Sequence, residues 1–432
     1  MYIFDSKILL SRLLTALTYI LLYFYVYKNY LVPTFGYMGY EYARVSNSYY
    51  LFVISLSLLP IVFFNGINNL SSFISILIYL LTYVPMVITI IFFEDIPFDL
   101  KIGYQIILLF AMTAFFSIDK LFVPRKLKKL SPGISFKSFV IIVLILSLYL
   151  FVFYRQNMRF VNFFELDNDL YQVRSENSMI SNQNILNRYL LPWTSKVLYP
   201  VLLVVFLIQR KYLNVVLVII SSWLIFTITA GKIDFFMPIL IIGFYFVLKK
   251  NTEFIKKYFF PIFVGAVLLI SLILFSNINN EIGYIFASLV FMRTISISGF
   301  LFATYVNFFQ THPNTNFAHV NIINSITNDY PYGNQDLGRV VFYGNMNGNA
   351  NFWVMDGVAG GGIVGVILIS ILLFILLIFI NRLKTLYDER ILYLLFLPIT
   401  MSLLNVSLFT TILSGGGLLL VMILCTLKLP LK

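Results

Sequence analysis

The chain has 432 residues, of which 60% are hydrophobic and 11% charged, and it carries a formal net charge of +12. This composition excludes a soluble globular protein and indicates a polytopic membrane protein. The basic excess does not indicate a nucleic-acid partner, because the lysines and arginines collect in particular loops between apolar runs. A lone cysteine, Cys425, excludes an internal disulfide.

Apolar runs long enough to span a membrane follow one another along the chain. The first is longer than a signal-peptide core and no small-residue cleavage site follows it, which indicates an uncleaved first span. The fold class expected is all-α, with about 12 transmembrane helices in a single transmembrane domain over 1–432. The Gly415-Gly416-Gly417 run either separates two spans or marks a broken or re-entrant segment. The predicted spans are 8–27, 49–66, 72–93, 103–118, 138–154, 197–209, 212–229, 235–248, 258–276, 354–380, 391–410 and 412–427.

The loop charges predict the orientation. With the N-terminus in the cytoplasm, the cytoplasmic side receives 19 basic and 5 acidic residues, with Arg12 near the inner end of the first span included. The outer side receives 11 basic and 13 acidic residues, with Asp356 near the outer end of span 354–380 included. This asymmetry is the one that positive-inside topology produces. We therefore expect both termini in the cytoplasm, and two large outer (periplasmic) segments, 155–196 and 277–353.

The outer segments hold arginines that positive-inside sorting does not explain. In 155–196, Arg174 and its neighbours either pair with local carboxylates or await an anionic ligand, since guanidinium binds phosphate with two parallel hydrogen bonds. In the short turn after 212–229, Lys232 has Asp234 as its nearest acidic residue in the sequence. Lys232 is a candidate for an anion site, and the alternative is a snorkelling lysine or a structural pair with Asp234.

The stretch 291–365 concentrates polar residues between apolar spans and contains both histidines, His312 and His319. Over 284–309 the pattern predicts an apolar helix lying against or partly in the membrane, with Arg293, Ser296, Thr304 and Asn307 on one side. A cation there is costly unless it faces a polar cavity or a partner, so Arg293 is a strong candidate site residue. The alternative is an arginine that snorkels to the membrane interface. The two histidines, without cysteine or paired carboxylates, do not form a convincing metal site, and no metal or cofactor is expected.

The end of this stretch combines amides with aromatic rings and glycines. Amides hydrogen-bond hydroxyl groups and rings cover the apolar face of a sugar, so Asn349, Asn351 and Trp353 are candidates for carbohydrate contact. The alternative interpretation is an Asn-capped helix start, with glycines that permit close helix packing. Asp356 opens the following span.

These residues resemble the bacterial O-antigen polymerases, the Wzy-type oligosaccharide repeat-unit polymerases. The likeness covers most of the chain, and its more specific part is the 291–365 block. Tyr171-x-x-Arg174 and Gly231-Lys232 extend it into the earlier part of the chain. Within the block it rests on Arg293-x-x-x-x-x-Gly299, Tyr305-x-x-Phe308-Phe309, His319, Tyr330-Pro331-Tyr332, Gly338 and Asn349-Ala350-Asn351-Phe352-x-x-x-Asp356-Gly357.

The resemblance implies a GT-C-like enzyme of the bacterial inner membrane in lipopolysaccharide or capsule-type polysaccharide biosynthesis. Such an enzyme transfers the growing glycan from undecaprenyl diphosphate to an incoming undecaprenyl-diphosphate-linked repeat unit at the periplasmic face. It requires no nucleotide sugar, and works with a flippase and a chain-length regulator of the same pathway. Arg174, Lys232, Arg293 and Arg339 are candidates to neutralise the leaving diphosphate, and His319 or Asp356 to accept the proton of the acceptor hydroxyl.

Two other functions stay open from the sequence. An O-antigen ligase performs the same chemistry with a lipid A–core acceptor. A non-enzymatic flippase of lipid-linked oligosaccharides is the second, although that class favours charges inside the spans and internal repeats. Most of the predicted spans lack charges.

Overall fold

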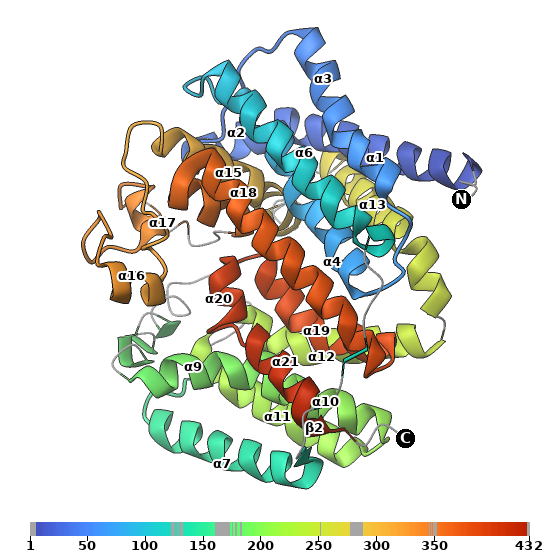
Figure 1. The fold of residues 1–432 in the computed structure, drawn as a ribbon, viewed down its shortest axis with the longest axis vertical. Helices are drawn as coiled ribbons and strands as arrows, with labels where there is room; N and C mark the ends of the chain where they lie inside the picture. The colour runs from blue at the N-terminus through green and yellow to red at the C-terminus, as the bar shows by residue number, and fades with distance from the viewer. Residues whose placement is uncertain are drawn as a thin grey trace. The chain divides into compact units, whose positions relative to one another are not determined.

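The computed structural model is almost entirely helical (Figure 1). It describes residues 6–121, 126–127, 129, 133–159, 173–174, 176–177, 179–181, 184–250, 252–276, 288–344, 346, 348 and 352–429. Within these residues the strands are β1 (Ile134–Ser135) and β2 (Leu427–Lys428), which pair in parallel. The all-α, multi-pass character expected from the sequence is therefore confirmed.

The chain divides into two compact units, each described here by itself. Unit 1 contains Met1–Pro124, Glu253–Asn381 and Leu404–Leu408, and unit 2 contains Arg125–Thr252, Arg382–Leu403 and Phe409–Lys432. Both units are therefore assembled from segments that are far apart in the sequence.

Unit 1 is built around the helical run from α4 to η5. Its sequence has no charged residue over Leu70–Phe92, and such a helix, apolar on every side, belongs in a protein interior. Almost all of its residues are buried, α6 packs against α4, and α15 packs against α5. The elements of unit 1 are α1 (Ser6–Val26), η1 (Tyr27–Leu31), α2 (Val32–Phe35), η2 (Gly36–Met38), α3 (Asn47–Leu58), η3 (Leu59–Phe63), α4 (Leu70–Ile78), η4 (Tyr79–Tyr83), α5 (Val84–Thr89), η5 (Ile90–Phe92), α6 (Phe98–Leu121), α13 (Thr252–Ser276), η7 (Ser288–Ser296), α15 (Ile297–Phe308), α16 (Asn321–Thr327), α17 (Leu337–Val340) and α18 (Phe352–Arg382).

Helix α18 is two helices joined by a sharp reversal. A methyl group built on Gly357 would lie 2.5 Å from the Cα of Val366, and one on Gly365 would collide with the carbonyl oxygen of Gly357. Residues eight apart on a continuous helix are separated by about 12 Å, so the chain folds back on itself. The reversal lies at Gly361 and Gly362, and Gly362 has φ 58° and ψ −134°, a conformation that favours glycine. We call residues 352–360 the short arm and residues 363–382 the long arm.

Unit 2 packs α10 against α11, α12 and α19. The run from α20 to α21 is interrupted before Gly417, and Trp193 Nε1 donates to the carbonyl of Leu413 in that break, at 3.0 Å. The alternative that the Gly415–Gly417 run breaks a helix is therefore confirmed. The elements of unit 2, besides β1 and β2, are α7 (Phe136–Tyr154), α9 (Ile185–Trp193), η6 (Thr194–Leu198), α10 (Tyr199–Ile208), α11 (Tyr212–Thr229), α12 (Lys232–Lys250), η8 (Leu383–Thr385), α19 (Glu389–Leu403), α20 (Leu408–Ile412) and α21 (Gly417–Thr426).

The described residues contain ten helices long and apolar enough to cross a membrane, against about twelve predicted. Predicted spans 49–66 and 391–410 correspond to shorter helices, and 235–248 lies in α12, whose ends carry charges. One candidate span, Ser288–Phe308, lies inside the segment 277–353 that the sequence analysis assigned to the outer side. The predicted span 354–380 is wrong at its start, because the short arm of α18 reverses before the long arm begins.

Candidate functional site

A buried histidine–carboxylate pair forms the most distinctive polar group of unit 1. His319 Nε2 lies 3.5 Å from Asp356 Oδ1, and the two side chains are 6% and 0% exposed. These two residues, 37 positions apart, are the alternative proton acceptors predicted from the sequence, and the structure brings them together. A buried ionisable pair of this kind is a recognised feature of sites that transfer protons.

The short arm of α18 carries Asp356 into this position. Its sequence, Phe-Trp-Val-Met-Asp-Gly-Val-Ala-Gly, has one ionisable residue, and the arm is buried throughout its described side chains. A buried carboxylate requires hydrogen-bond donors. The backbone N–H of Leu408 donates to Asp356 Oδ2 at 2.9 Å, so one carboxylate oxygen is satisfied and the other faces His319.

The loop before His319 is anchored on the C-terminal end of the short arm. The last carbonyls of a helix lack partners within the helix. Here Asn314 Nδ2 donates to Val358 O at 3.0 Å, and the backbone N–H of Thr315 donates to Ala359 O at 2.8 Å. These bonds fix the position of the loop, and Thr315 Oγ1 lies 2.7 Å from His319 Nδ1.

Other residues of the 291–365 block converge on the same unit. The Tyr305 hydroxyl donates to Gly348 O at 3.4 Å, and the Gly348 N–H donates to Gly338 O at 3.0 Å. Tyr332 donates to Pro313 O at 2.6 Å, which ties the later part of the loop to the segment before His319. The Tyr330 hydroxyl donates to Gln335 O at 2.9 Å, and burial raises the pKa of this phenol to about 12.

Arg293 lies on η7 with an exposed side chain, and it has no hydrogen bond or ion pair with any described residue. The prediction that Arg293 and Ser296 share one side is wrong. Ser296 is fully buried and accepts a hydrogen bond from Tyr23 at 3.2 Å. The reason is that η7 is π-helical, so the 3.6-residue period assumed for this stretch does not apply.

Two other predicted ligand residues, Arg174 and Lys232, belong to unit 2. Arg174 Nη2 donates to Ala230 O at 3.0 Å, and Lys232 follows two residues later at the start of α12. Ala230 ends α11 in the left-handed region, with φ 47°, and Asn177 Nδ2 donates to Ile228 O at 2.8 Å. The turn between α11 and α12 is thus bound on one side by residues of the first polar segment.

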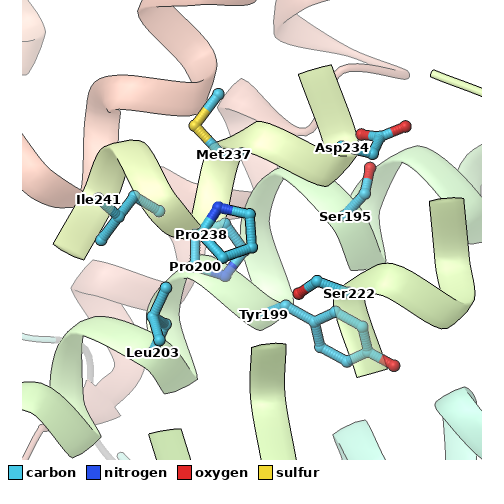
Figure 2. Close-up of a pocket in the computed structure, with 9 residues that line it drawn as sticks. All are labelled: Ser195, Tyr199, Pro200, Leu203, Ser222, Asp234, Met237, Pro238 and Ile241. Atoms are coloured by element: carbon cyan, nitrogen blue, oxygen red, sulfur yellow. The ribbon is translucent and has the colours of Figure 1, made fainter. Parts of the chain in front are cut away.

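A small pocket lies beside this turn (Figure 2). Asp234 and Ser195 lie at one end of it, and its other lining is largely apolar (Figure 2). Asp234 accepts a hydrogen bond from Thr229 Oγ1 at 2.8 Å. The carboxylate is therefore held by its own turn and contributes polarity to one end of the pocket.

The remaining predicted site residues have different surroundings. Arg339 is exposed on α17. Trp353 is 2% exposed and packs edge-on against Phe115 with ring centroids 5.4 Å apart, so in this conformation it presents no face to a sugar. Asn349, Asn351 and Tyr171 lie outside the described residues. In the described part of the chain no three His, Cys, Asp or Glu side chains cluster as metal ligands.

Comparison of the chain with protein-family models, curated proteins and solved structures gives no match.

Three contributors to the site were not predicted from the sequence: Asn314, Thr315 and the backbone N–H of Leu408. A backbone donor leaves no sequence signal, and Thr315 is recognisable only once Ala359 and His319 are seen on either side of it.

Proposed function

We propose that this protein polymerises lipid-linked oligosaccharide repeat units. It transfers the growing glycan from undecaprenyl diphosphate to an incoming undecaprenyl-diphosphate-linked unit at the periplasmic face of the inner membrane, in a GT-C-like fold. The observation that carries the proposal is the buried His319–Asp356 pair. Two residues on which the family resemblance rests, chosen from sequence as candidate proton acceptors, are joined in one site.

The chemistry requires a proton acceptor and cationic side chains. The acceptor hydroxyl must lose its proton as the glycosidic bond forms, and the His319–Asp356 pair supplies ionisable groups for that step. The leaving diphosphate requires charge neutralisation, for which the exposed guanidinium groups of Arg293 and Arg339 in unit 1 are suited. In unit 2, the exposed Arg174 is a separate candidate for the same role. Lys232, beside the Arg174 contact, adds a further cation near that turn.

The partners that this function requires are the lipid-linked repeat unit itself, a flippase that delivers it and a chain-length regulator. The many apolar helices agree with substrates that stay in the membrane through their polyprenyl chains.

Deletion of the gene in its native host, followed by gel analysis of surface polysaccharide, tests the proposal. The expected result is lipopolysaccharide with at most one repeat unit, because ligation continues without polymerisation, and restoration of the ladder by the wild-type gene but not by Asp356→Asn. Bare core with long chains left on the carrier lipid would identify a ligase instead. Single units accumulating on the cytoplasmic leaflet would identify a flippase.

A further inference from the structure

The hydroxyl of Thr315 makes two contacts that bear on where His319 carries a hydrogen. Thr315 is fully buried, and its Oγ1 lies 3.0 Å from Ala359 O and 2.7 Å from His319 Nδ1. A carbonyl oxygen accepts only, and a hydroxyl has one hydrogen to give. Both contacts are hydrogen bonds if the hydroxyl donates to Ala359 O and the His319 Nδ1–H donates to the hydroxyl oxygen.

The opposite nitrogen of the ring then requires a second proton. His319 Nε2 faces Asp356 Oδ1 at 3.5 Å, and within the described residues neither atom has a hydrogen-bond partner. With its hydrogen on Nδ1, a neutral imidazole would point a bare lone pair at a carboxylate oxygen, leaving two acceptors unpaired in a buried site. That arrangement is unfavourable, and a proton on Nε2 relieves it.

We infer that Thr315 is a positioning residue that holds His319 with a hydrogen on Nδ1, and that Nε2 carries the proton that faces the ionised Asp356. The imidazolium and the carboxylate cancel in charge, which lowers the cost of burying them. The Leu408 N–H stabilises the ionised form of Asp356 from the other side. The Tyr305 phenol is another titratable group that interacts electrostatically with the Asp356 carboxylate.

The catalytic consequence rests on the proposed function. Both ring nitrogens of His319 are occupied, so the proton acceptor is the Asp356 carboxylate rather than the imidazole. The acceptor hydroxyl reaches Oδ1 by displacing the Nε2 contact, which is long for a hydrogen bond. Its O–H bond breaks with the proton passing to Asp356, its oxygen bonds the anomeric carbon of the donor, and the bond to the diphosphate breaks with its electron pair on the leaving group.

Solid-state ¹⁵N NMR of the full-length protein in lipid bilayers, labelled at histidine, reads the proton positions without substrate. The chain has two histidines, so a His312→Gln variant displays His319 alone. At pH 7 we expect both His319 nitrogens in the protonated range. A non-protonated nitrogen signal from either Nδ1 or Nε2 would overturn the inference.

Two variants at Thr315 distinguish the effect of its hydroxyl group from the effect of its side-chain size. Thr315→Ser keeps the hydroxyl and should preserve both the spectrum and the polymerisation rate. Thr315→Val should shift the Nδ1 signal away from its hydrogen-bonded position and lower the rate roughly five- to ten-fold, the effect of one lost hydrogen bond. An unchanged Nδ1 signal in Thr315→Val would contradict the assigned role. The NMR spectrum is recorded without substrate. If it matches the prediction but the protein does not polymerise repeat units, the proposed function is refuted and the proton positions assigned to His319 still stand.

Discussion

Asp356 could be recognised from the sequence as the one ionisable residue of a nine-residue apolar stretch, which is costly unless it is paired. His319 could be singled out as a histidine in a long ordered loop. Their pairing could not be predicted, because it depends on the reversal of α18 and on the anchoring of Thr315 to Ala359. Trp353 shows the opposite case. Its aromatic character suggested sugar contact, and the fold buries it against Phe115.

Arg293 supplies the prediction at the scale of single residues. Lysine keeps the charge but loses the planar two-donor geometry, so Arg293→Lys should shorten the glycan ladder, and Arg293→Ala should shorten it further or abolish it. A lost charged hydrogen bond is worth about 1.5–3 kcal/mol, or roughly ten- to a hundred-fold in rate if it is formed in the transition state. Gel analysis of polysaccharide from strains with equal amounts of protein in the membrane measures this.

The matched control is Arg390→Ala. Arg390 is an exposed arginine that pairs with Asp388 at 3.1 Å and lies in the predicted cytoplasmic loop. Its loss removes an exposed ion pair of small energetic value, and the ladder should stay normal. A normal ladder from Arg293→Ala as well would show that Arg293 has no part in the reaction.

At the scale of elements, the composition of α18 was predictable and its path was not. Its apolar run indicated one continuous span over 354–380, whereas the structure breaks it at Gly361 and Gly362. The glycines were assigned to close helix packing, and Gly357 and Gly365 do form a close backbone contact. That contact lies between the two arms of α18 itself. The spacing of glycines in a sequence does not show whether they pack against the same helix or against a neighbouring one.

Gly365→Ala tests the reversal. The added methyl group would collide with the carbonyl oxygen of Gly357, and because backbone cannot rotate away, the cost should be at least about 1–3 kcal/mol. We expect a lower melting temperature of the purified protein in detergent, together with lost activity. Gly265→Ala in α13 is the control, since a methyl group there meets no atom within 4 Å and should be neutral or stabilising. Equal melting temperatures for the two variants would contradict the folded-back path.

At the scale of the whole molecule, the helix Ser288–Phe308 decides on which side of the membrane His319 lies. It is long and apolar enough to cross. Lys256 and Lys257 lie near the start of α13. Arg382 is the last residue of α18, and Lys384 follows two residues later. Three crossings between these basic groups would place them on opposite sides, against the positive-inside rule, whereas two crossings keep both in the cytoplasm. We therefore expect the helix Ser288–Phe308 to enter the membrane and to leave it on the same side.

Labelling of introduced cysteines measures on which side of the membrane each segment lies. In a Cys425→Ser background, Ile185→Cys and Ile326→Cys should react with a membrane-impermeant maleimide in intact spheroplasts, and both positions are exposed. Glu253→Cys should react only after permeabilisation, which also serves as the accessibility control. If Ile326→Cys is protected while Ile185→Cys is labelled, then Ser288–Phe308 crosses the membrane. His319 would then lie on the opposite side of the membrane from Ile185.

The most direct test of the account is reconstitution. The purified protein in liposomes would be given the undecaprenyl-diphosphate-linked single units that accumulate in the deletion strain, with no nucleotide sugar and no lipid A–core, and the products analysed by mass spectrometry. We predict carrier-linked chains of two or more repeat units with release of undecaprenyl diphosphate, and a rate at least about a hundred-fold lower for Asp356→Asn, the smaller end of what a positioned proton acceptor contributes. Single units left unchanged by the wild-type protein, or consumed only when lipid A–core is added, would contradict it.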